Sequence, residues 1–239
     1  MGLFEKPWSQ IRAWLDDQQT SPHVRDLVAA DYENWPQKST MVLAEDTAVE
    51  LGNPGIGSLS LVMWAPVNNE VMDDQISILG PDVPEMTEAA APFAQLLIVG
   101  GEIEDEYECY RDLKEVIYQT RLSGFMVRAL PSRQHIWCRV SREAKEKGFS
   151  LAHWGAALSH NAKRLDFVTR AQVIFVTGDK DWLQPLMQPA LEVGRIAGAL
   201  VKMKEEMNFD CESCEFWDVC ETVAELKIIR RKLLEGKQT

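Results

Sequence analysis

The 239-residue sequence contains few cysteines and few histidines, five and four respectively. An odd cysteine count, with Cys109 and Cys138 scattered, makes a poor disulfide framework and favours a reducing compartment. No apolar run approaches the about 20 residues that cross a bilayer. The N-terminal segment MGLFEKPWSQIRAW also lacks the basic start and long apolar core of a secretory signal. We therefore expect a cytoplasmic protein without a membrane span.

The sequence also lacks an excess of positive charge. Its formal net charge of −12 argues against nucleic-acid binding, because phosphate neutralisation needs a basic face. The segment from Tyr110 to Arg170 is an exception, with 12 Lys or Arg against five Asp or Glu. This basic segment indicates either an anionic ligand or an acidic partner surface, although a solvated helical face would give the same count.

Two parts of the chain differ in their hydrophobic pattern. Trp8, Ile11 and Leu15 recur at helical spacing, which predicts a helical N-terminal arm. From Met41 onward, short apolar runs alternate with turns that contain Gly or Pro, and this pattern predicts strands. The strands are expected at 41–51, 58–64, 75–79, 93–99, 135–140 and 171–176.

Helices are expected between and after these strands, at 102–122, 151–165, 181–207 and 222–234. Pro185 and Pro189 should confine the regular part of the third helix to its later half. The irregular order of strands and helices favours an α+β fold, with a mixed sheet and packed helices. We divide the chain into a helical arm (1–40), an α+β domain (41–180) and a helical, cysteine-bearing segment (181–239).

The most concentrated chemistry is the C-x2-C-x5-C cluster of Cys211, Cys214 and Cys220. This spacing lets three thiolates approach one centre, and thiolates are the ligands that iron–sulfur clusters and zinc select. Eight Asp or Glu and no Lys or Arg lie between positions 205 and 225. The spacing therefore predicts a shared metal centre, and the acidic surroundings predict that it is hard to reduce.

A closed metal site needs a fourth ligand, which the cluster itself does not supply. The candidates are Cys109, Cys138, a carboxylate such as Asp210, a solvent or substrate molecule, or a cysteine from a second copy in a homo-oligomer. The alternative is that the three cysteines only pack a helix junction and bind no metal. His153 and His160, with Lys163, favour a solvated helix face over a pocket. No catalytic residue can be named from the sequence.

Several ordered segments between Met41 and Cys220 resemble the β subunit of the carbon monoxide dehydrogenase/acetyl-CoA synthase complex, which assembles acetyl-CoA. The segments are VELG at 49–52 with Pro54, ISILGPD at 76–82 with Glu85 and Met86, WCRVSREA at 137–144 with Lys147 and Gly148, the positions Leu151, His153 and Gly155, and the pair Gln172-Val173. The resemblance implies the central α+β domain of that family, followed by the start of its cluster loop.

The resemblance also implies cofactors. Cys211, Cys214 and Cys220 would correspond to the first three cysteine ligands of the cubane part of the family's nickel–iron–sulfur cluster. The fourth cubane cysteine and the nickel-binding Cys-Gly-Cys element have no counterpart in this sequence. We therefore expect a 4Fe–4S cluster without nickel, and not a complete acetyl-CoA synthase.

The family's central domain helps to bind coenzyme A through arginines and an aromatic residue near its W-x-R strand. By resemblance, Arg128, Arg133, Arg139 and Trp137 are the candidate coenzyme A residues here. Trp137 and Arg139 are two positions apart on one predicted strand, so their side chains should share a face. The competing interpretation places Trp137 in the core and pairs Arg139 with a carboxylate on a helix.

Three functions remain open. The leading hypothesis is an iron–sulfur accessory protein or subunit, which relays electrons or docks a protein partner in anaerobic one-carbon or corrinoid metabolism. The second is a small-molecule enzyme or binder, which holds an acyl-thioester or a coenzyme A-like anion at an open cluster site or an arginine-lined pocket. The third is a metal-free scaffold subunit.

Overall fold

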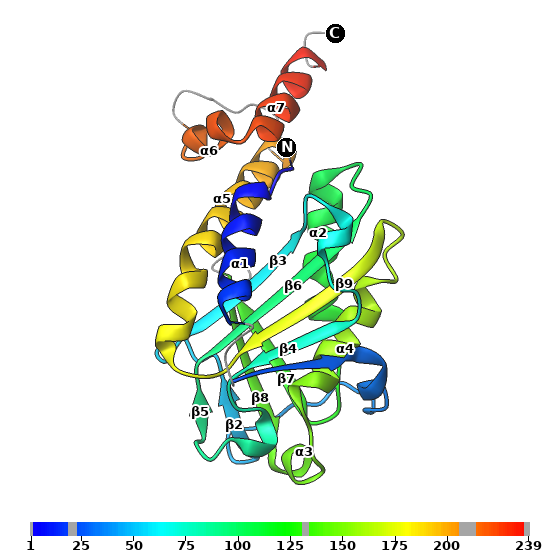
Figure 1. Ribbon diagram of the computed structural model, residues 1–239, viewed down its shortest axis with the longest axis vertical. Helices are drawn as coiled ribbons and strands as arrows, with labels where there is room; N and C mark the ends of the chain where they lie inside the picture. The colour runs from blue at the N-terminus through cyan, green and yellow to red at the C-terminus, as the bar shows by residue number, and fades with distance from the viewer. Residues whose placement is uncertain (1, 19–22, 131–133, 206–213, 237–239) are drawn as a thin grey trace.

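The computed structural model describes residues 2–18, 23–130, 134–205 and 214–236. It contains a five-stranded and a four-stranded sheet with helices packed around them, which confirms the α+β fold (Figure 1). The strands are β1 (Val24–Val28), β2 (Thr47–Leu51), β3 (Ser58–Trp64), β4 (Gln75–Leu79), β5 (Ala90–Ala91), β6 (Phe93–Gly101), β7 (Phe125–Leu130), β8 (His135–Ser141) and β9 (Val168–Val176). The α-helices are α1 (Glu5–Gln18), α2 (Glu106–Gln119), α3 (Arg142–Glu146), α4 (Leu151–Ala162), α5 (Gln184–Glu205), α6 (Trp217–Thr222) and α7 (Ala224–Gly236). Short 3-10 turns are η1 (Ala29–Tyr32), η2 (Asn68–Glu70), η3 (Val83–Glu85) and η5 (Lys180–Leu183).

The five-stranded sheet has the order β1-β4-β9-β6-β3 and is mixed. Strand β3 pairs with β6 in parallel and β4 with β9 in parallel, whereas β6–β9 and β1–β4 are antiparallel. Eight successive residues of β6, from Phe93 to Gly100, are buried. A continuous apolar run of this kind is typical of a strand that is covered on both faces, and it places the core around this sheet.

The four-stranded sheet has the order β5-β2-β8-β7. Its strand β8 alternates strictly, with Ile136, Cys138 and Val140 buried and the residues between them half-buried. This period of two sends one face of the strand into the core and the other outward. The outward face therefore carries Trp137 and Arg139.

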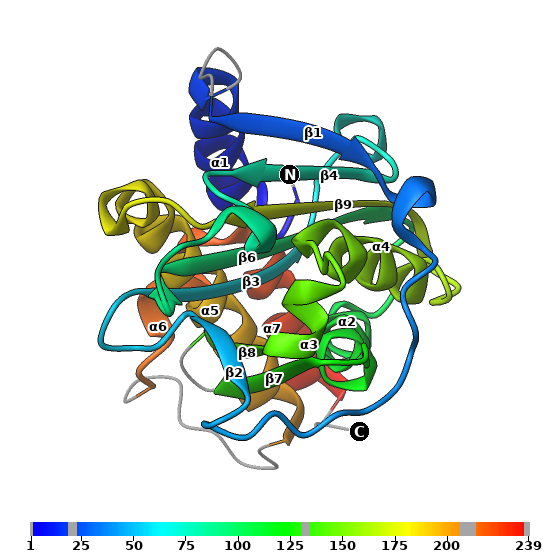
Figure 2. The same ribbon diagram turned by 90° about the horizontal axis from the view of Figure 1, so that it is seen from below.

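The helices surround the larger sheet. Helix α4 packs against β4, β9 and β6, and α5 packs against α1 and along β3. Figure 2 shows α1 and α4 on opposite sides of the five strands, with β2, β8 and β7 forming a separate layer. Gly155 permits the close approach of α4, because a Cβ there would lie 3.0 Å from the Ile76 side chain on β4. Within the described residues, no helix is long and apolar enough to cross a membrane.

The structure confirms the expected strands 58–64 and 75–79 to the residue, and it extends those at 93–99 and 135–140 by one or two positions. The strand expected at 41–51 begins only at Thr47. Val24–Val28, inside the expected helical arm, forms the edge strand β1, and Phe125–Leu130 forms the unpredicted strand β7. The division of the chain into three parts stays a prediction.

The prolines do not shorten α5 as expected. The helix runs from Gln184 to Glu205, with Pro185 in its first turn and Pro189 inside it. A proline in the first turn is harmless, because the N–H that it lacks would have no partner within the helix. The expected restriction of regular helix to the later half is therefore wrong.

Candidate metal centre and signature segments

Cys214 and Cys220 line one small cavity between α5, α6 and α7. The cavity has a volume of about 20 Å³, and Met203, Phe216 and Trp217 supply its apolar walls. Cys220 is buried and Cys214 is half-buried, and neither forms a disulfide. The described walls leave room for one atom about the size of a water molecule. Two of the three predicted ligands therefore share one site, whereas Cys211 lies outside the described residues.

Helix α5 holds the residues between Cys214 and Cys220 in place. Arg195 donates to Asp218 on α6, with Nη1 2.8 Å from Oδ2, and to the carbonyl oxygen of Glu215. Phe216 lies directly over Gly198, where a Cβ would come within 2.8 Å of the ring. The glycine therefore lets the segment between the two cysteines pack close to the axis of α5.

Arg230 brings a positive charge to this cavity from α7. Its Nη2 donates to Glu221 Oε1 at 2.5 Å, and its guanidinium lies over the ring of Trp217 at 4.9 Å. Its Nη1 is buried and has no hydrogen-bond partner among the described residues. A buried donor without an acceptor is costly, and a thiolate or sulfide sulfur is an acceptor that would satisfy it. Two thiols and this orphaned N–H suit an anionic, thiolate-ligated centre, but the described cavity has room for one atom and does not enclose a four-iron cluster.

Cys138 and Cys109 do not line the cavity. Cys138 faces the core from β8, and burial raises the pKa of its thiol well above the ordinary value. Cys109 lies on α2, and burial also raises the pKa of its thiol. Both side chains are therefore suited to packing as protonated thiols. Within the part of the chain that the structure describes, no group of three or more His, Cys, Asp or Glu is placed to hold a metal ion.

The candidate coenzyme A residues lie on the outward face of the smaller sheet. The guanidinium of Arg128 lies 5.1 Å and that of Arg139 5.2 Å from the ring centre of Trp137. The expected common face of Trp137 and Arg139 is therefore present. The Nε1 atom of Trp137 is buried and makes no hydrogen bond of normal geometry within the described residues. Arg133 lies outside the described residues.

Arg139 already has an anionic partner. Its Nε donates to Glu50 Oε1 at 3.1 Å, and both side chains are about four-fifths buried. Burial opposes the ionisation of Glu50, but hydrogen bonds from Asn53 and Arg139 hold its pKa below the ordinary value. The carboxylate comes from strand β2 rather than from a helix, and Trp137 does not face the core. The competing interpretation is therefore right that Arg139 pairs with a carboxylate, and wrong about the helix and about the position of Trp137.

The residues His153 and Lys163 have structural partners. His153 Nδ1 accepts from the backbone N–H of Ser150 and completes a capping box at the start of α4. Burial lowers the pKa of His153, which favours the neutral, accepting form. Lys163 Nζ lies 2.5 Å from Asp74 Oδ2, and Ser159 Oγ donates to the same aspartate. Lys163 and Ser159 thus tie α4 to the residue before β4. His153 and His160 line a cavity of about 80 Å³ next to Tyr32 and Trp35, so this face of α4 borders a pocket.

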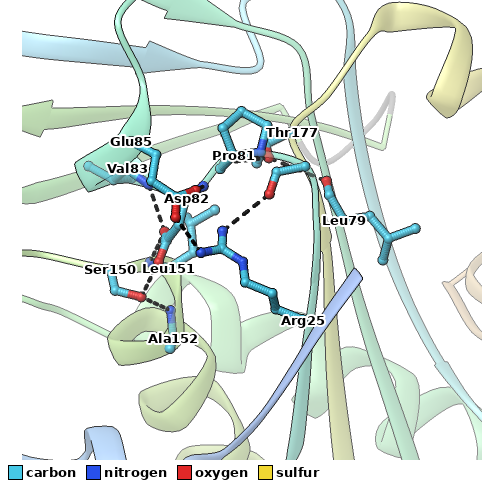
Figure 3. A network of polar contacts seen from close by, with 11 residues as sticks. Arg25, Leu79, Pro81, Asp82, Val83, Glu85, Ser150, Leu151, Ala152 and Thr177 are labelled. Atoms are coloured by element: carbon cyan, nitrogen blue, oxygen red, sulfur yellow. Dashed lines mark hydrogen bonds and ion pairs between the residues drawn. The ribbon is translucent and has the colours of Figure 1, made fainter. Parts of the chain in front are cut away.

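Asp82 joins the larger sheet to α4 (Figure 3). Its Oδ1 accepts from the backbone N–H groups of Val83 and Leu151, at 2.7 and 2.8 Å, and its Oδ2 accepts from Ser150 Oγ at 2.5 Å. The Glu85 carboxylate accepts in return from the N–H of Asp82 at 3.0 Å. One buried carboxylate thus caps η3 and the N-terminus of α4 together.

The neighbours of Asp82 extend this junction. Arg25 on β1 pairs with Glu85 at 2.6 Å and donates to the carbonyl oxygen of Gly80 at 3.2 Å. Lys145 on α3 donates to the carbonyl oxygen of Met86 at 2.5 Å. Ser77 Oγ on β4 also donates to Asp26 Oδ1 on β1 at 2.5 Å, so each polar side chain of the segment ISILGPD-x-x-EM has a structural partner. The segment fastens β1, α3 and α4 to the end of β4.

Residues 38–182 match the family model described as the CO dehydrogenase/acetyl-CoA synthase complex beta subunit. The chain belongs to this family. The matched residues include the segments VELG and WCRVSREA, which lie on the paired strands β2 and β8, and they include Asp82 with its partners on η3 and α4. They exclude the cysteine segment, which begins at Cys211.

Curated members of this family are similar to part of this chain. The acetyl-CoA decarbonylase/synthase complex subunit beta 1 of Methanosarcina mazei is 31% identical over 185 residues, which cover 73% of this chain and 38% of the relative. The subunit beta of Methanothermobacter thermautotrophicus is 39% identical over 113 residues, covering 46% and 24%. That of Archaeoglobus fulgidus is 32% identical over 146 residues, covering 59% and 27%. The aligned part thus spans less than two fifths of each of these relatives.

Sequence reasoning missed two residues in this member of the beta-subunit family. Glu50 was known only as part of the VELG segment, and nothing in its spacing points to Arg139, which lies 89 positions away. Arg230 lies in a helix of ordinary amphipathic composition, and only the packing of α7 brings it to the cavity. Opposite charges on two neighbouring strands could have suggested the role of Glu50, but no sequence signal indicates that of Arg230.

Proposed function

We propose that this chain is a cytoplasmic subunit that contributes an iron–sulfur centre, held by Cys211, Cys214 and Cys220, to a protein complex of anaerobic one-carbon or corrinoid metabolism. In that complex it relays electrons or docks a protein partner. The cavity that Cys214 and Cys220 share with the orphaned Arg230 Nη1 supports the proposal most strongly. When bound, a cluster of this kind supplies one-electron transfer at a potential set by its surroundings.

Different residues of the chain would bind the centre and shield it from water. Three thiolates would hold the centre, and the walls formed by Phe216 and Met203 would keep water away from it. The fourth ligand would come from outside the described cavity, from solvent, substrate, an acidic side chain or a second copy. The sequence has no Cys-Gly-Cys element, so the 239-residue chain is expected to bind no stoichiometric nickel.

Cysteine variants test the metal centre. Wild-type protein is purified without oxygen, and its iron, zinc and nickel contents and its absorbance near 400 nm are measured. Cys214→Ala should lose most of the bound metal and the absorbance. Cys138→Ala is the matched control, because it removes a buried thiol outside the cavity and should keep both. Equal loss in the two variants would contradict a site at Cys214, and a colourless, metal-free wild type would favour the scaffold alternative.

A coenzyme A-like anion is the second candidate function, and one observation favours it. Two guanidinium groups lie over one indole ring on an outward face, which can pair a phosphate with arginine and stack an adenine-like ring. Of these two arginines, Arg128 is exposed, whereas Arg139 already forms an ion pair with Glu50. Arg128 is therefore the one available to an anion. Arg133 would add a third cation.

Calorimetric titration with coenzyme A tests this second candidate. Arg128→Ala should weaken binding at least tenfold. Arg121→Ala is the control, because it removes an exposed arginine that hydrogen-bonds the carbonyl oxygen of Thr120 and lines a different cavity, with Asp112 and Arg164. Absence of heat at millimolar ligand with wild-type protein would eliminate the candidate.

A further inference from the structure

A further cavity lies between α4 and the part of the chain that follows β1. The turn η1 packs against α4, and Figure 2 shows the chain after β1 passing along this helix. The cavity has a volume of about 80 Å³, against about 20 Å³ for the cavity beside Cys214. Since one water needs about 10–15 Å³ of such space, the larger cavity can hold a group of several non-hydrogen atoms. We call it the aromatic cavity, because the rings of Tyr32, Trp35 and His153 line it.

The three rings are held in place by contacts outside the cavity. The centre of the His153 ring lies 4.7 Å from that of Trp35 and 5.3 Å from that of Tyr32. Trp35 Nε1 donates to the carbonyl oxygen of Ser123 at 2.9 Å, and His153 Nδ1 accepts from the backbone N–H of Ser150. The faces of aromatic rings carry the negative part of their quadrupole and attract cations. The cavity therefore offers a pre-formed aromatic lining to a positive charge.

The charge beside these rings is negative. Glu33 lines the cavity, is exposed, and has no hydrogen-bond or ion-pair partner among the described residues. None of the described Lys or Arg side chains lines it. Burial lowers the pKa of His153, which keeps its ring neutral near pH 7. The local field therefore favours a cation over an anion, and the chain's net charge of −12 acts in the same direction.

The remaining lining is mostly apolar. Ala156 and Ala157 on α4 are buried, and with Leu122 they supply small or aliphatic side chains to the cavity. A hydrated ammonium or sodium ion would lose its water there and gain few hydrogen-bond acceptors in return. A methylated ammonium ion loses less hydration, because its methyl groups bind water weakly and pack against apolar atoms and ring faces. The lining therefore selects for an alkylated cation.

We propose that the aromatic cavity binds a small methylated ammonium cation, with Tyr32, Trp35 and His153 as its ring contacts and Glu33 as its counter-charge. The positive charge of such an ion is spread over its methyl groups, which contact the ring faces, and the carboxylate balances it. This site involves none of the cysteines, so it is independent of the metal centre and goes beyond the proposed function.

NMR spectroscopy of the full chain, with tetramethylammonium chloride as the probe, tests the proposal. The indole N–H resonance of Trp35 is assigned by its loss in Trp35→Phe, and in the wild type it should shift saturably at millimolar probe. Sodium chloride at the same ionic strength should not shift it. The uncharged molecule tert-butanol has a similar size and should bind about tenfold more weakly, because it lacks the charge. No saturable shift, or equal affinity for the two probes, would overturn the proposal.

Glutamate variants test the counter-charge. Glu33→Gln should weaken binding of tetramethylammonium about threefold or more, and it should leave the fold intact because Glu33 is exposed. Glu88→Gln is the matched control, since it makes the same change in net charge at an exposed glutamate that does not line the cavity. It should leave the affinity unchanged. Equal weakening in both variants would reflect overall charge alone and would contradict a site at Glu33.

Trp35→Leu tests the ring contact. It removes one of the three rings and should weaken binding about tenfold, measured by saturation transfer from the protein to the methyl protons of the probe. Trp217→Leu removes a tryptophan on α6 and should keep the wild-type affinity. Trp35 is half-buried, so circular dichroism checks the fold of its variant, and the glutamate pair decides the outcome if that variant does not fold. Unchanged affinity in folded Trp35→Leu would overturn the proposal.

Discussion

Arg139 Nε donates to Glu50 Oε1 across 3.1 Å and joins strands β8 and β2. These residues come from two of the segments that carry the family resemblance, WCRVSREA and VELG. The Trp137 ring covers the same guanidinium, so the pair is shielded from water on one side. The contact indicates that Arg139 helps to hold the smaller sheet together, whatever ligand that sheet binds.

Removing Arg139 should therefore lower stability. Arg139→Ala removes the charged partner of Glu50, whose side chain is about four-fifths buried. We expect a loss of about 1–2 kcal/mol in the free energy of unfolding. Urea denaturation measures it. Arg128→Ala is the control, since Arg128 is exposed on the neighbouring strand over the same ring, and it should cost less than half as much. Equal losses would show that the Glu50 contact contributes nothing.

The stability of the fold should also decrease in acid, because Glu50 and Glu85 become protonated. The pKa of Glu50 and that of Glu85 lie below the ordinary value of 4.5 in the folded protein. A depressed folded pKa stabilises the fold above the unfolded pKa, and this contribution is lost as the pH falls through the folded value. The thermal midpoint, measured from pH 6 to pH 3, should therefore begin to decrease once the pH is lowered below about 4.5. The fall should be shallower in Glu50→Gln, and an unchanged slope in that variant would contradict the assignment.

The Asp82 junction should contribute more to the free energy of unfolding than an ordinary helix cap does. Asp82→Ala removes one buried carboxylate that accepts three hydrogen bonds and should cost about 2–4 kcal/mol in the free energy of unfolding. Asp105→Ala is the comparison, because Asp105 also accepts from two backbone N–H groups at a helix start but is about half exposed, and it should cost about 1 kcal/mol. Urea denaturation that ranks the two variants in the reverse order would refute the junction.

Local pattern predicted the strands with mostly buried residues and missed the edge strand β1. The strands β3 and β4 are apolar runs between turn residues, and their burial leaves one consistent register. Strand β1 was missed because Arg25 and Asp26 interrupt its pattern, which an edge strand tolerates. Met41 and Leu43 favoured a strand by residue type, but both are exposed and lie outside every described strand.

The candidate site was predictable only in part. The thiolate spacing pointed to Cys214 and Cys220, and the structure places both at one cavity. The charge at that cavity was not predictable from local sequence, since Arg230 arrives with the packing of α7. The partner of Arg139 was likewise set by the pairing of β2 with β8, which joins positions 89 apart in the chain.

X-ray absorption at the iron edge of the wild-type protein, purified without oxygen, tests the central claim most directly. The account predicts iron at close to one cluster per chain, with sulfur as the dominant first neighbour and iron atoms at a second, short distance, as in an iron–sulfur cluster. The sulfur shell should be lost in Cys214→Ala. Iron at background level, or iron surrounded only by oxygen and nitrogen, would contradict the claim.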